Sequence, residues 1–122
     1  MTDDRLNFKD MCARFDVTPR TLRYYEYIEL LAPEKEGRSR FYGQREMARM
    51  TLILRGRRWG FSLEEIRQWL EIREHQGDSA QLEEFVRLAD RQLEALQLER
   101  VQLDETIAEL KAQREDVLGN LA

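Results

Sequence analysis

Proline, glycine and cysteine are scarce in this sequence, and long apolar runs are absent. Two prolines and six glycines interrupt 122 residues, which suits a helix-rich protein. No run approaches the roughly 18 apolar residues of a membrane helix. The N-terminus also lacks the apolar stretch of a secretory signal. We therefore expect a cytoplasmic protein with no membrane contact.

Reactive side chains are equally few. Cys12 is the only cysteine, so no internal disulfide is expected, and one thiol with the single histidine, His75, makes a poor metal site. The sequence has no glycine-rich phosphate loop and no paired acids placed for catalysis. It therefore predicts neither an enzyme nor a protein with a metal or other cofactor.

The charge is distributed unevenly along the chain. The formal net charge is −4, but residues 1–75 carry 15 basic and 13 acidic side chains, whereas residues 76–122 carry 5 and 11. The segment 18–58 holds 10 basic against 5 acidic residues, and nine of the ten are arginines. Aromatic residues alternate with these arginines, which favours a nucleic-acid-binding surface. The acidic total does not exclude one, because the local field decides where a polyanion docks.

Apolar spacing predicts a short first helix over residues 8–15. Phe8, Met11, Cys12 and Phe15 recur at i, i+3, i+4 and i+7. Cys12 belongs to this apolar stripe, so we interpret it as a buried small apolar side chain rather than a reactive thiol.

A second helix is predicted to begin at Thr18 and Pro19, because threonine caps the free amides of a helix start and proline suits the first helical position. The short gap after the first helix fits a helix-turn-helix. At about 100° per residue, Leu22 faces the core with Tyr25 and Glu26 beside it. The residues expected to point outward are Arg20, Arg23, Tyr24 and Tyr27.

Residues 34–42 lack helical periodicity and predict a β-hairpin with its turn at Gly37. A third helix is expected over 44–59. Ser62 and Glu65 form a capping box that opens a fourth helix. The inward residues expected on these two helices are Met47, Met50, Ile53, Leu54, Ile66, Trp69 and Leu70.

A seven-residue repeat occupies residues 81–118 and predicts a coiled-coil helix that needs a partner. A helix of this length cannot pack over its whole extent on a small domain. The dimerisation seam expected from the repeat consists of Leu82, Val86, Ala89, Leu93, Leu96, Arg100, Leu103, Ile107 and Leu110.

Two arginines of the seven-residue repeat, Arg100 and Arg114, favour antiparallel pairing. A parallel pair would place Arg100 on Arg100 and Arg114 on Arg114 of the partner. With partner numbers that sum to 196, Arg100 instead lies opposite Leu96 and Arg114 opposite Leu82, where the arginine stems can cover leucine. A sum of 203 fits almost as well, so the register stays open.

The stretch 17–26 resembles the recognition-helix signature of the MerR family of bacterial transcription regulators, and the core Thr-Leu-Arg-Tyr-Tyr-Glu is present at 21–26. Arg40 and Tyr42 are similar to the family's wing motif, and residues 60–66 to its second hallmark. The resemblance covers residues 5–75. It implies a mainly α fold, a winged helix-turn-helix followed by a dimerisation helix.

The resemblance also implies a function. Members of the family bind near-palindromic promoter elements as dimers, and they bend and untwist the DNA for RNA polymerase. The expected partners are therefore double-stranded promoter DNA, a second copy of the chain and, indirectly, RNA polymerase, at the bacterial nucleoid. Drug-sensing relatives add an effector domain, and metal-sensing relatives use cysteines at the far end of the dimerisation helix and in a loop after it; we expect neither here. A small ligand, a partner protein or no effector at all are the remaining possibilities.

The residues expected to contact DNA fall into two groups. Arg20 and Tyr24 are candidates for base edges, since arginine can donate a bidentate pair to guanine. The others are expected to contact the phosphates of the DNA backbone and so set the position of the protein on the duplex. For Arg57 and Arg58, solvated ends of a core helix are nearly as good an interpretation. The second group comprises Thr18, Thr21, Arg23, Tyr25, Arg38, Arg40, Tyr42, Arg57 and Arg58.

The sequence departs from the family pattern at two places. Glu29 stands where a glycine is common after the recognition helix. The wing reads Arg38-Ser39-Arg40 in place of Gly-Tyr-Arg, which makes Arg38 an additional candidate for a phosphate contact.

The chain is expected to divide into a DNA-binding domain (5–75), a linker (76–80) and a coiled-coil helix (81–118). Two other functions fit the sequence less well. A coiled-coil adaptor for proteins would leave the outward arginines of the second helix without a purpose. A phage-type architectural DNA binder would often lack the long helix.

Overall fold

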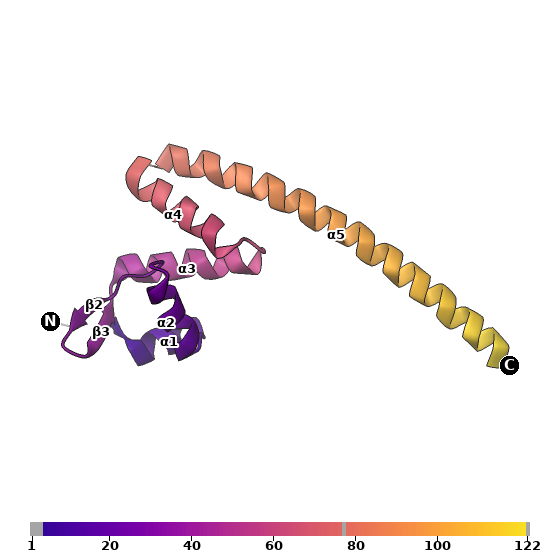
Figure 1. Cartoon of the computed structure of the whole chain (residues 1–122), viewed down its shortest axis with the longest axis horizontal. Coiled ribbons are helices and arrows are strands. Elements are labelled where there is room, and N and C mark those ends of the chain that lie inside the picture. Colours follow the sequence, from indigo (N-terminus) through magenta and orange to yellow (C-terminus); the bar gives the residue numbers. More distant parts are fainter. Residues whose placement is uncertain (1–3, 77, 122) are drawn as a thin grey trace. The chain divides into compact units, whose positions relative to one another are not determined.

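The computed structural model describes residues 4–76 and 78–121. Short elements come first and one long helix follows (Figure 1). The chain divides into two compact units, one ending at Gln81 and the other beginning at Leu82. In chain order, the elements are β1 (Leu6–Asn7), α1 (Phe8–Phe15), α2 (Pro19–Tyr27), β2 (Glu34–Glu36), β3 (Ser39–Tyr42), α3 (Gln44–Arg58), α4 (Leu63–Gln76) and α5 (Asp78–Leu121).

Helices α2 and α4 begin where the sequence supplies capping side chains. The Thr18 hydroxyl accepts a hydrogen bond from the Thr21 amide at 3.1 Å, and Pro19 is the first residue of α2. Before α4, the Ser62 hydroxyl accepts from the Glu65 amide at 3.1 Å while the Glu65 carboxylate accepts from the Ser62 amide at 2.9 Å. The predicted capping box is confirmed.

Three helices end in the same local motif, with one residue in the left-handed region. After α2, the Glu29 amide donates to the Glu26 carbonyl and the Leu30 amide to the Tyr25 carbonyl. This is the Schellman pattern, in which the left-handed residue is usually glycine. Glu29 occupies that place with φ +64°, and Gly60 occupies it after α3 with φ +93°. Asp16 has the same role after α1, with φ +52°.

The three strands form one small antiparallel sheet in the order β1-β3-β2. The hairpin of β2 and β3 is the predicted one, turning through Gly37 at φ +63°. Strand β1 was not predicted, because two residues are too short to show an alternating pattern. It pairs Leu6 with Tyr42, which attaches the start of the chain to the hairpin.

The core of the first unit lies where α1, α2, α3 and α4 meet. Gly56 allows α3 to approach α4 closely, since a Cβ there would lie 3.0 Å from two side-chain carbons of Ile66. Met47 and Leu54, which we expected to point inward, are only partly buried. The fully or almost fully buried side chains include Met11, Leu22, Leu30, Tyr42, Met50, Ile53, Phe61, Ile66 and Leu70.

The second unit is a continuous helix. Helix α5 has 44 residues, about 66 Å at 1.5 Å per residue. It begins at Asp78, so residues 78–80, which we assigned to a linker, are helical, and Gly77 lies outside the described residues. Apolar side chains of the predicted seam are exposed along it, from Leu82 to Leu110. In the described part of the chain, no helix has the length and apolarity needed to cross a bilayer.

Candidate nucleic-acid interface

Helix α2 presents arginines and tyrosines to the outside, as predicted. Leu22 is fully buried on its inner face, which fixes the rotation of the helix. Tyr24 is 49% exposed and Tyr27 is 83% exposed, and Arg20 and Arg23 are exposed as well. Two arginines and two tyrosines thus share the outward face of this nine-residue helix.

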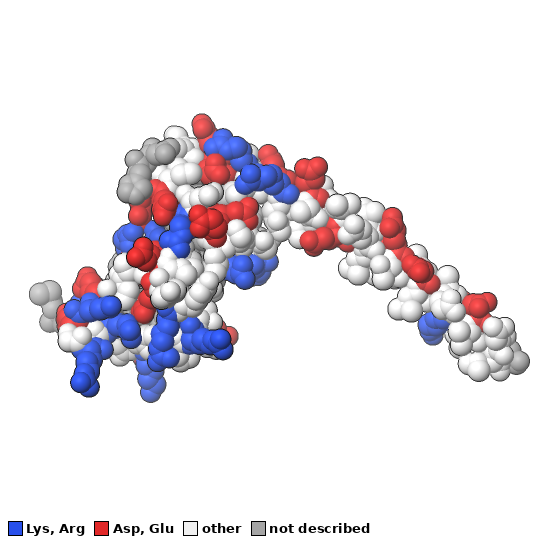
Figure 2. Space-filling model, viewed as in Figure 1, with Lys and Arg blue, Asp and Glu red and all other residues white. Residues whose placement is uncertain are grey.

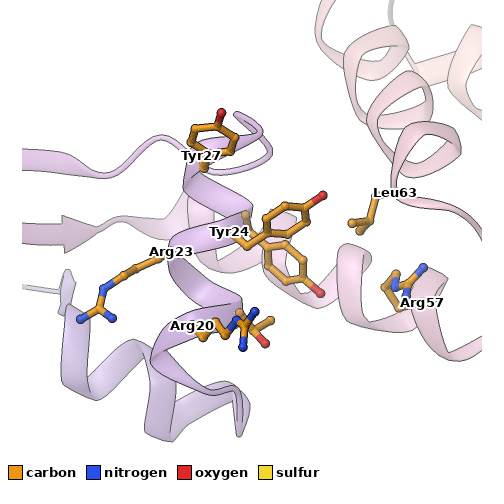
Figure 3. Close-up of a pocket in the computed structure, with 8 residues that line it drawn as sticks. Arg20, Arg23, Tyr24, Tyr27, Arg57 and Leu63 are labelled. Carbon is orange, nitrogen blue, oxygen red and sulfur yellow. The ribbon is translucent and has the colours of Figure 1, made fainter.

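A hollow of about 580 Å³ lies beside this face. Figure 3 shows Tyr24 pointing from α2 toward Leu63 and Arg57, while Arg23 points to the opposite side. The Arg57 guanidinium donates to the Phe61 carbonyl at 3.2 Å, so its position is fixed by the turn between α3 and α4. The residues that line the hollow are Arg20, Thr21, Arg23, Tyr24, Tyr25, Tyr27, Arg57 and Leu63. The hollow is thus basic and aromatic, without an acidic side chain among its lining residues.

Two guanidinium groups are held against Phe8. Arg23 lies 5.2 Å from the centre of the ring and Arg40 lies 5.8 Å from it. Contacts of this kind are attractive because the face of an aromatic ring is electron-rich. Phe8 therefore keeps one arginine of α2 and one of β3 close together.

Glu26 connects α2 to β3, the strand that carries Arg40 and Tyr42 and that we call the wing strand. Its carboxylate accepts a hydrogen bond from the Tyr42 hydroxyl, and its Oε2 lies 3.3 Å from Arg40 Nε. Burial, and then the hydrogen bond to Glu26, raise the pKa of Tyr42 well above its usual range. The carboxylate is only 13% exposed. Glu26 therefore holds α2 and β3 in a fixed position relative to each other.

Two tyrosines proposed as phosphate contacts, Tyr25 and Tyr42, are buried, although Tyr25 also borders the hollow. Tyr42 is fully buried with its hydroxyl bound to Glu26, so its side chain is not available to DNA in this structure. Tyr25 is 7% exposed, and burial raises the pKa of its hydroxyl while Arg57 opposes the rise. The burial of Tyr25 agrees with helical periodicity, which places it beside the core. The burial of Tyr42 could not be predicted, because side chains alternate between the two faces of a strand and the sequence does not decide which face of β3 is buried.

The hairpin carries both signs of charge. Arg38 follows the turn at Gly37 and is exposed. Glu34 and Glu36 lie on β2, and one Arg5 guanidinium nitrogen, Nη1, contacts their carboxylates at 2.7 and 2.9 Å. The same guanidinium group lies 4.4 Å from the centre of the Phe41 ring. Arg5 thus offsets two acidic side chains that would otherwise repel a phosphate backbone.

Figure 2 shows Lys and Arg side chains gathered on the lower side of the first unit. Arg20, Arg23, Arg38 and Arg58 are exposed residues of that unit, and Arg40 is partly buried. Thr18 is exposed at the start of α2, where its hydroxyl also donates to the Thr21 hydroxyl at 3.0 Å. Apart from the two buried tyrosines, the expected contact residues therefore retain surface.

Sequence reasoning missed Arg5, Phe8 and Glu26 as parts of the interface. Arg5 directly precedes β1 and Phe8 is the first residue of α1, both outside the arginine-rich segment 18–58, so their spacing gave no signal. Helical periodicity predicts Glu26 only as a residue that flanks the core. A glutamate inside an arginine-rich segment is itself a signal, since a carboxylate that faces DNA would weaken binding.

Cys12 is partly buried on α1, and burial raises the pKa of its thiol while Arg23 opposes the rise. Among the side chains that the structure describes, no three metal-ligating groups come together. The side chain of His75 lies outside the described part of the structure.

Comparison with known families gives two overlapping matches. The family model of the MerR HTH family regulatory proteins matches residues 6–72. A second model, MerR, DNA binding, matches residues 47–113. Together they cover the winged unit and most of α5.

Two curated relatives match different lengths of the chain. The HTH-type transcriptional regulator ZntR of Escherichia coli is 43% identical over 60 residues, which are 48% of this chain and 43% of ZntR. The chain thus spans less than half the length of that relative. The HTH-type transcriptional regulator PA4778 of Pseudomonas aeruginosa is 31% identical over 109 residues, covering 84% of this chain and 83% of that protein.

Solved structures share the fold. A MerR family transcriptional regulator from Bacillus cereus superposes with a TM-score of 0.72 at 28% identity, over 88% of this chain and 78% of that one. HiNmlR, a MerR family regulator lacking the sensor domain and bound to promoter DNA, superposes with a TM-score of 0.64 at 19% identity, over 84% and 78%.

Proposed function

Because the chain belongs to the MerR family of DNA-binding transcriptional regulators, we propose that it works as a homodimer on a dyad-symmetric promoter element. Each protomer inserts α2 into a major groove and lays the hairpin and the α3–α4 turn along the backbone. The dimer bends and untwists the element, and RNA polymerase responds to the altered DNA. HiNmlR provides a precedent for promoter binding by a fold of this kind without a sensor domain.

The outward face of α2 is the observation that carries this proposal. Arg20 and Tyr24 are exposed on a helix whose inner face is locked by Leu22. A rigid helix that presents a bidentate donor suits the reading of base edges. Arg23 and Arg57 flank it and supply the charge for adjacent phosphates.

The exposed apolar stripe of α5 supports the homodimer. Leu82, Val86, Leu93, Leu103 and Leu110 are all more than half exposed in the single chain. A contiguous stripe of this size on a water-facing helix marks an interface. Antiparallel pairing is proposed because it separates the like charges of the seam arginines. It also places the two DNA-binding units at opposite ends of the pair.

A binding experiment tests the DNA proposal. Duplexes that bind the protein are selected from a random pool, and affinity for the selected duplex is measured by fluorescence anisotropy at several salt concentrations. If about six to ten phosphates are contacted, affinity falls roughly 10³–10⁵-fold between 50 and 200 mM salt. Selected sequences without dyad symmetry, or salt-independent binding, would contradict the proposal. Failure to select any duplex would favour a protein adaptor.

Cysteine cross-linking tests the antiparallel pair in a Cys12→Ala background. Glu83 and Lys111 are exposed on α5, and their numbers place them close to each other across an antiparallel pair whose sum is near 196. A mixture of Glu83→Cys and Lys111→Cys chains should give mainly the mixed cross-link. An Asp90→Cys chain should pair better with Lys111→Cys if the sum is 203. Efficient cross-links between identical variants at 83 and at 111 would mean parallel helices.

A further inference from the structure

The loop that follows α2 is held at its backbone by charged side chains of α3. The Leu30 carbonyl accepts a hydrogen bond from Arg49 Nε at 2.8 Å. Two residues later, the Ala32 amide donates to Glu46 Oε2 at 2.9 Å. The side chains of Arg49 and Glu46 are only 10% and 8% exposed. Both contacts are therefore made inside the protein, where such hydrogen bonds are strong.

Helix α4 reaches the same loop from a second direction. Arg67 donates to the Ile28 carbonyl, and Glu74 Oε1 accepts from Arg49 Nη1 at 2.6 Å. Arg45 donates to Glu74 as well and forms an ion pair with Glu46. Glu74 thus contacts Arg49 directly and Glu46 only through Arg45, and it orients the guanidinium group that binds Leu30.

Stability alone is a weak explanation for this arrangement. Buried ion pairs lose much of their Coulomb attraction to the cost of removing charges from water, and well-packed apolar residues are often as good. An ion network does fix orientation, because the planar Arg49 guanidinium must be oriented to donate to the Leu30 carbonyl and the Glu74 carboxylate at the same time. This orientation fixes the backbone of the segment after α2 at Leu30 and Ala32.

We propose that Glu74 is a positioning residue for the recognition helix: through Arg49 it fixes the Leu30 carbonyl, and with it the tilt of α2. The proposal rests on the proposed function, in which α2 reads base edges. Helix α2 has nine residues, about 13 Å in length, so a 1 Å displacement of its end tilts it by roughly 4°. Base contacts depend on hydrogen-bond distances and would register such a tilt.

The first test needs no DNA. The amides of Leu30 and Leu31 both donate to the Tyr25 carbonyl, at 2.9 and 3.3 Å. In Glu74→Gln, hydrogen exchange at these two amides should quicken about tenfold, as expected for a weakened charge-assisted contact. Amides in the middle of α3 should be unchanged. The matched control is Glu71→Gln, which removes the same charge from an exposed position on α4.

The second test measures reading of the sequence. The ratio of affinities for the selected duplex and for duplexes with one altered base pair should fall about five- to tenfold in Glu74→Gln, and affinity for random DNA should stay the same. Arg49→Lys, which keeps the charge but offers no planar fork, should behave likewise.

Three outcomes decide the matter. Local acceleration of exchange with a lower ratio supports the proposal. Exchange that is unchanged, or that rises equally throughout α1 and α3, overturns it because Glu74 then has a general structural role or none. Local acceleration with an unchanged ratio also overturns it. If the wild-type chain binds no DNA, the proposed function fails, and the exchange comparison alone decides whether Glu74 fixes the loop.

Discussion

The Tyr42 hydroxyl donates a hydrogen bond to the Glu26 carboxylate, which connects the last residue of the wing strand to the recognition helix. Tyr42 is fully buried, so the bond is shielded from water. Arg40, two residues earlier in the same strand, lies 3.3 Å from the other oxygen of the same carboxylate. Strand β3 and helix α2 are therefore held together by Glu26, whose carboxylate contacts Tyr42 and Arg40.

Tyr42→Phe should lower the free energy of unfolding by about 1.5–3 kcal/mol, the usual range for a hydrogen bond to a charged group. The pKa of Tyr42 is raised in the folded protein, so its contribution is complete below the unfolded value of about 10 and declines as pH rises above it. Denaturant unfolding of wild type and variant at pH 7 and pH 11 measures this. The difference between the two proteins should be smaller at pH 11, and an equal difference would contradict the assignment.

Glu29→Gly should stabilise the protein by about 0.5–1 kcal/mol. A left-handed residue other than glycine costs roughly 1–2 kcal/mol, and the freedom of glycine in the unfolded chain cancels part of the gain. Gly60→Ala provides the mirror experiment, because Gly60 has the same place in the motif after α3. It should be destabilising. Thermal unfolding of both variants gives the comparison, and a destabilised Glu29→Gly protein would show that the side chain has another role.

Arg5→Ala should weaken binding to specific and random DNA alike, by about 3- to 10-fold, on the order of 1 kcal/mol for an exposed charge effect. The reason is that Glu34 and Glu36 lose their common partner and face the phosphates uncompensated. Adding Glu34→Gln and Glu36→Gln to the variant should restore most of the affinity. If the triple variant binds as weakly as Arg5→Ala, the arginine contacts DNA itself.

Arg20→Ala and Arg38→Ala should affect DNA binding in different ways. Loss of Arg20 should cost about 1–3 kcal/mol on the selected duplex and relax preference at one base pair in each half-site. Loss of Arg38 should reduce affinity for all duplexes by a similar factor and lower the salt dependence. Arg38 serves better than Arg40 here, since Arg40 is also bound to Glu26. Uniform losses in both variants would contradict the division into base and backbone contacts.

The parts of the fold that could be predicted are those determined by residues close together in the sequence. Thr18, Ser62 and Glu65 cap the helices they were expected to cap, because a cap depends on neighbours within four residues. The rotation of α2 also followed from its sequence, with Leu22 inward. Strand β1 was missed because a two-residue pairing leaves no periodic signal.

The interface was predictable only in part, since a motif names residues without giving their exposure. Tyr42 belongs to a signature associated with DNA binding, yet it supports Glu26 from inside the fold. Arg5 acts across 29 residues of chain to reach Glu34. Contacts made by tertiary packing of this kind cannot be read from spacing along one segment.

The uncovered apolar stripe of α5 has a consequence for dosage. If two chains must associate before both half-sites are occupied, then below the dimerisation constant the amount of active species rises with the square of the protein concentration. Occupancy of the promoter would then respond more steeply to a change in expression than a one-chain regulator allows. Once one protomer is bound, its partner is held near the second half-site at a high effective concentration. In the proposed dimer, the strength of the α5 seam would set the expression level at which the regulator begins to act.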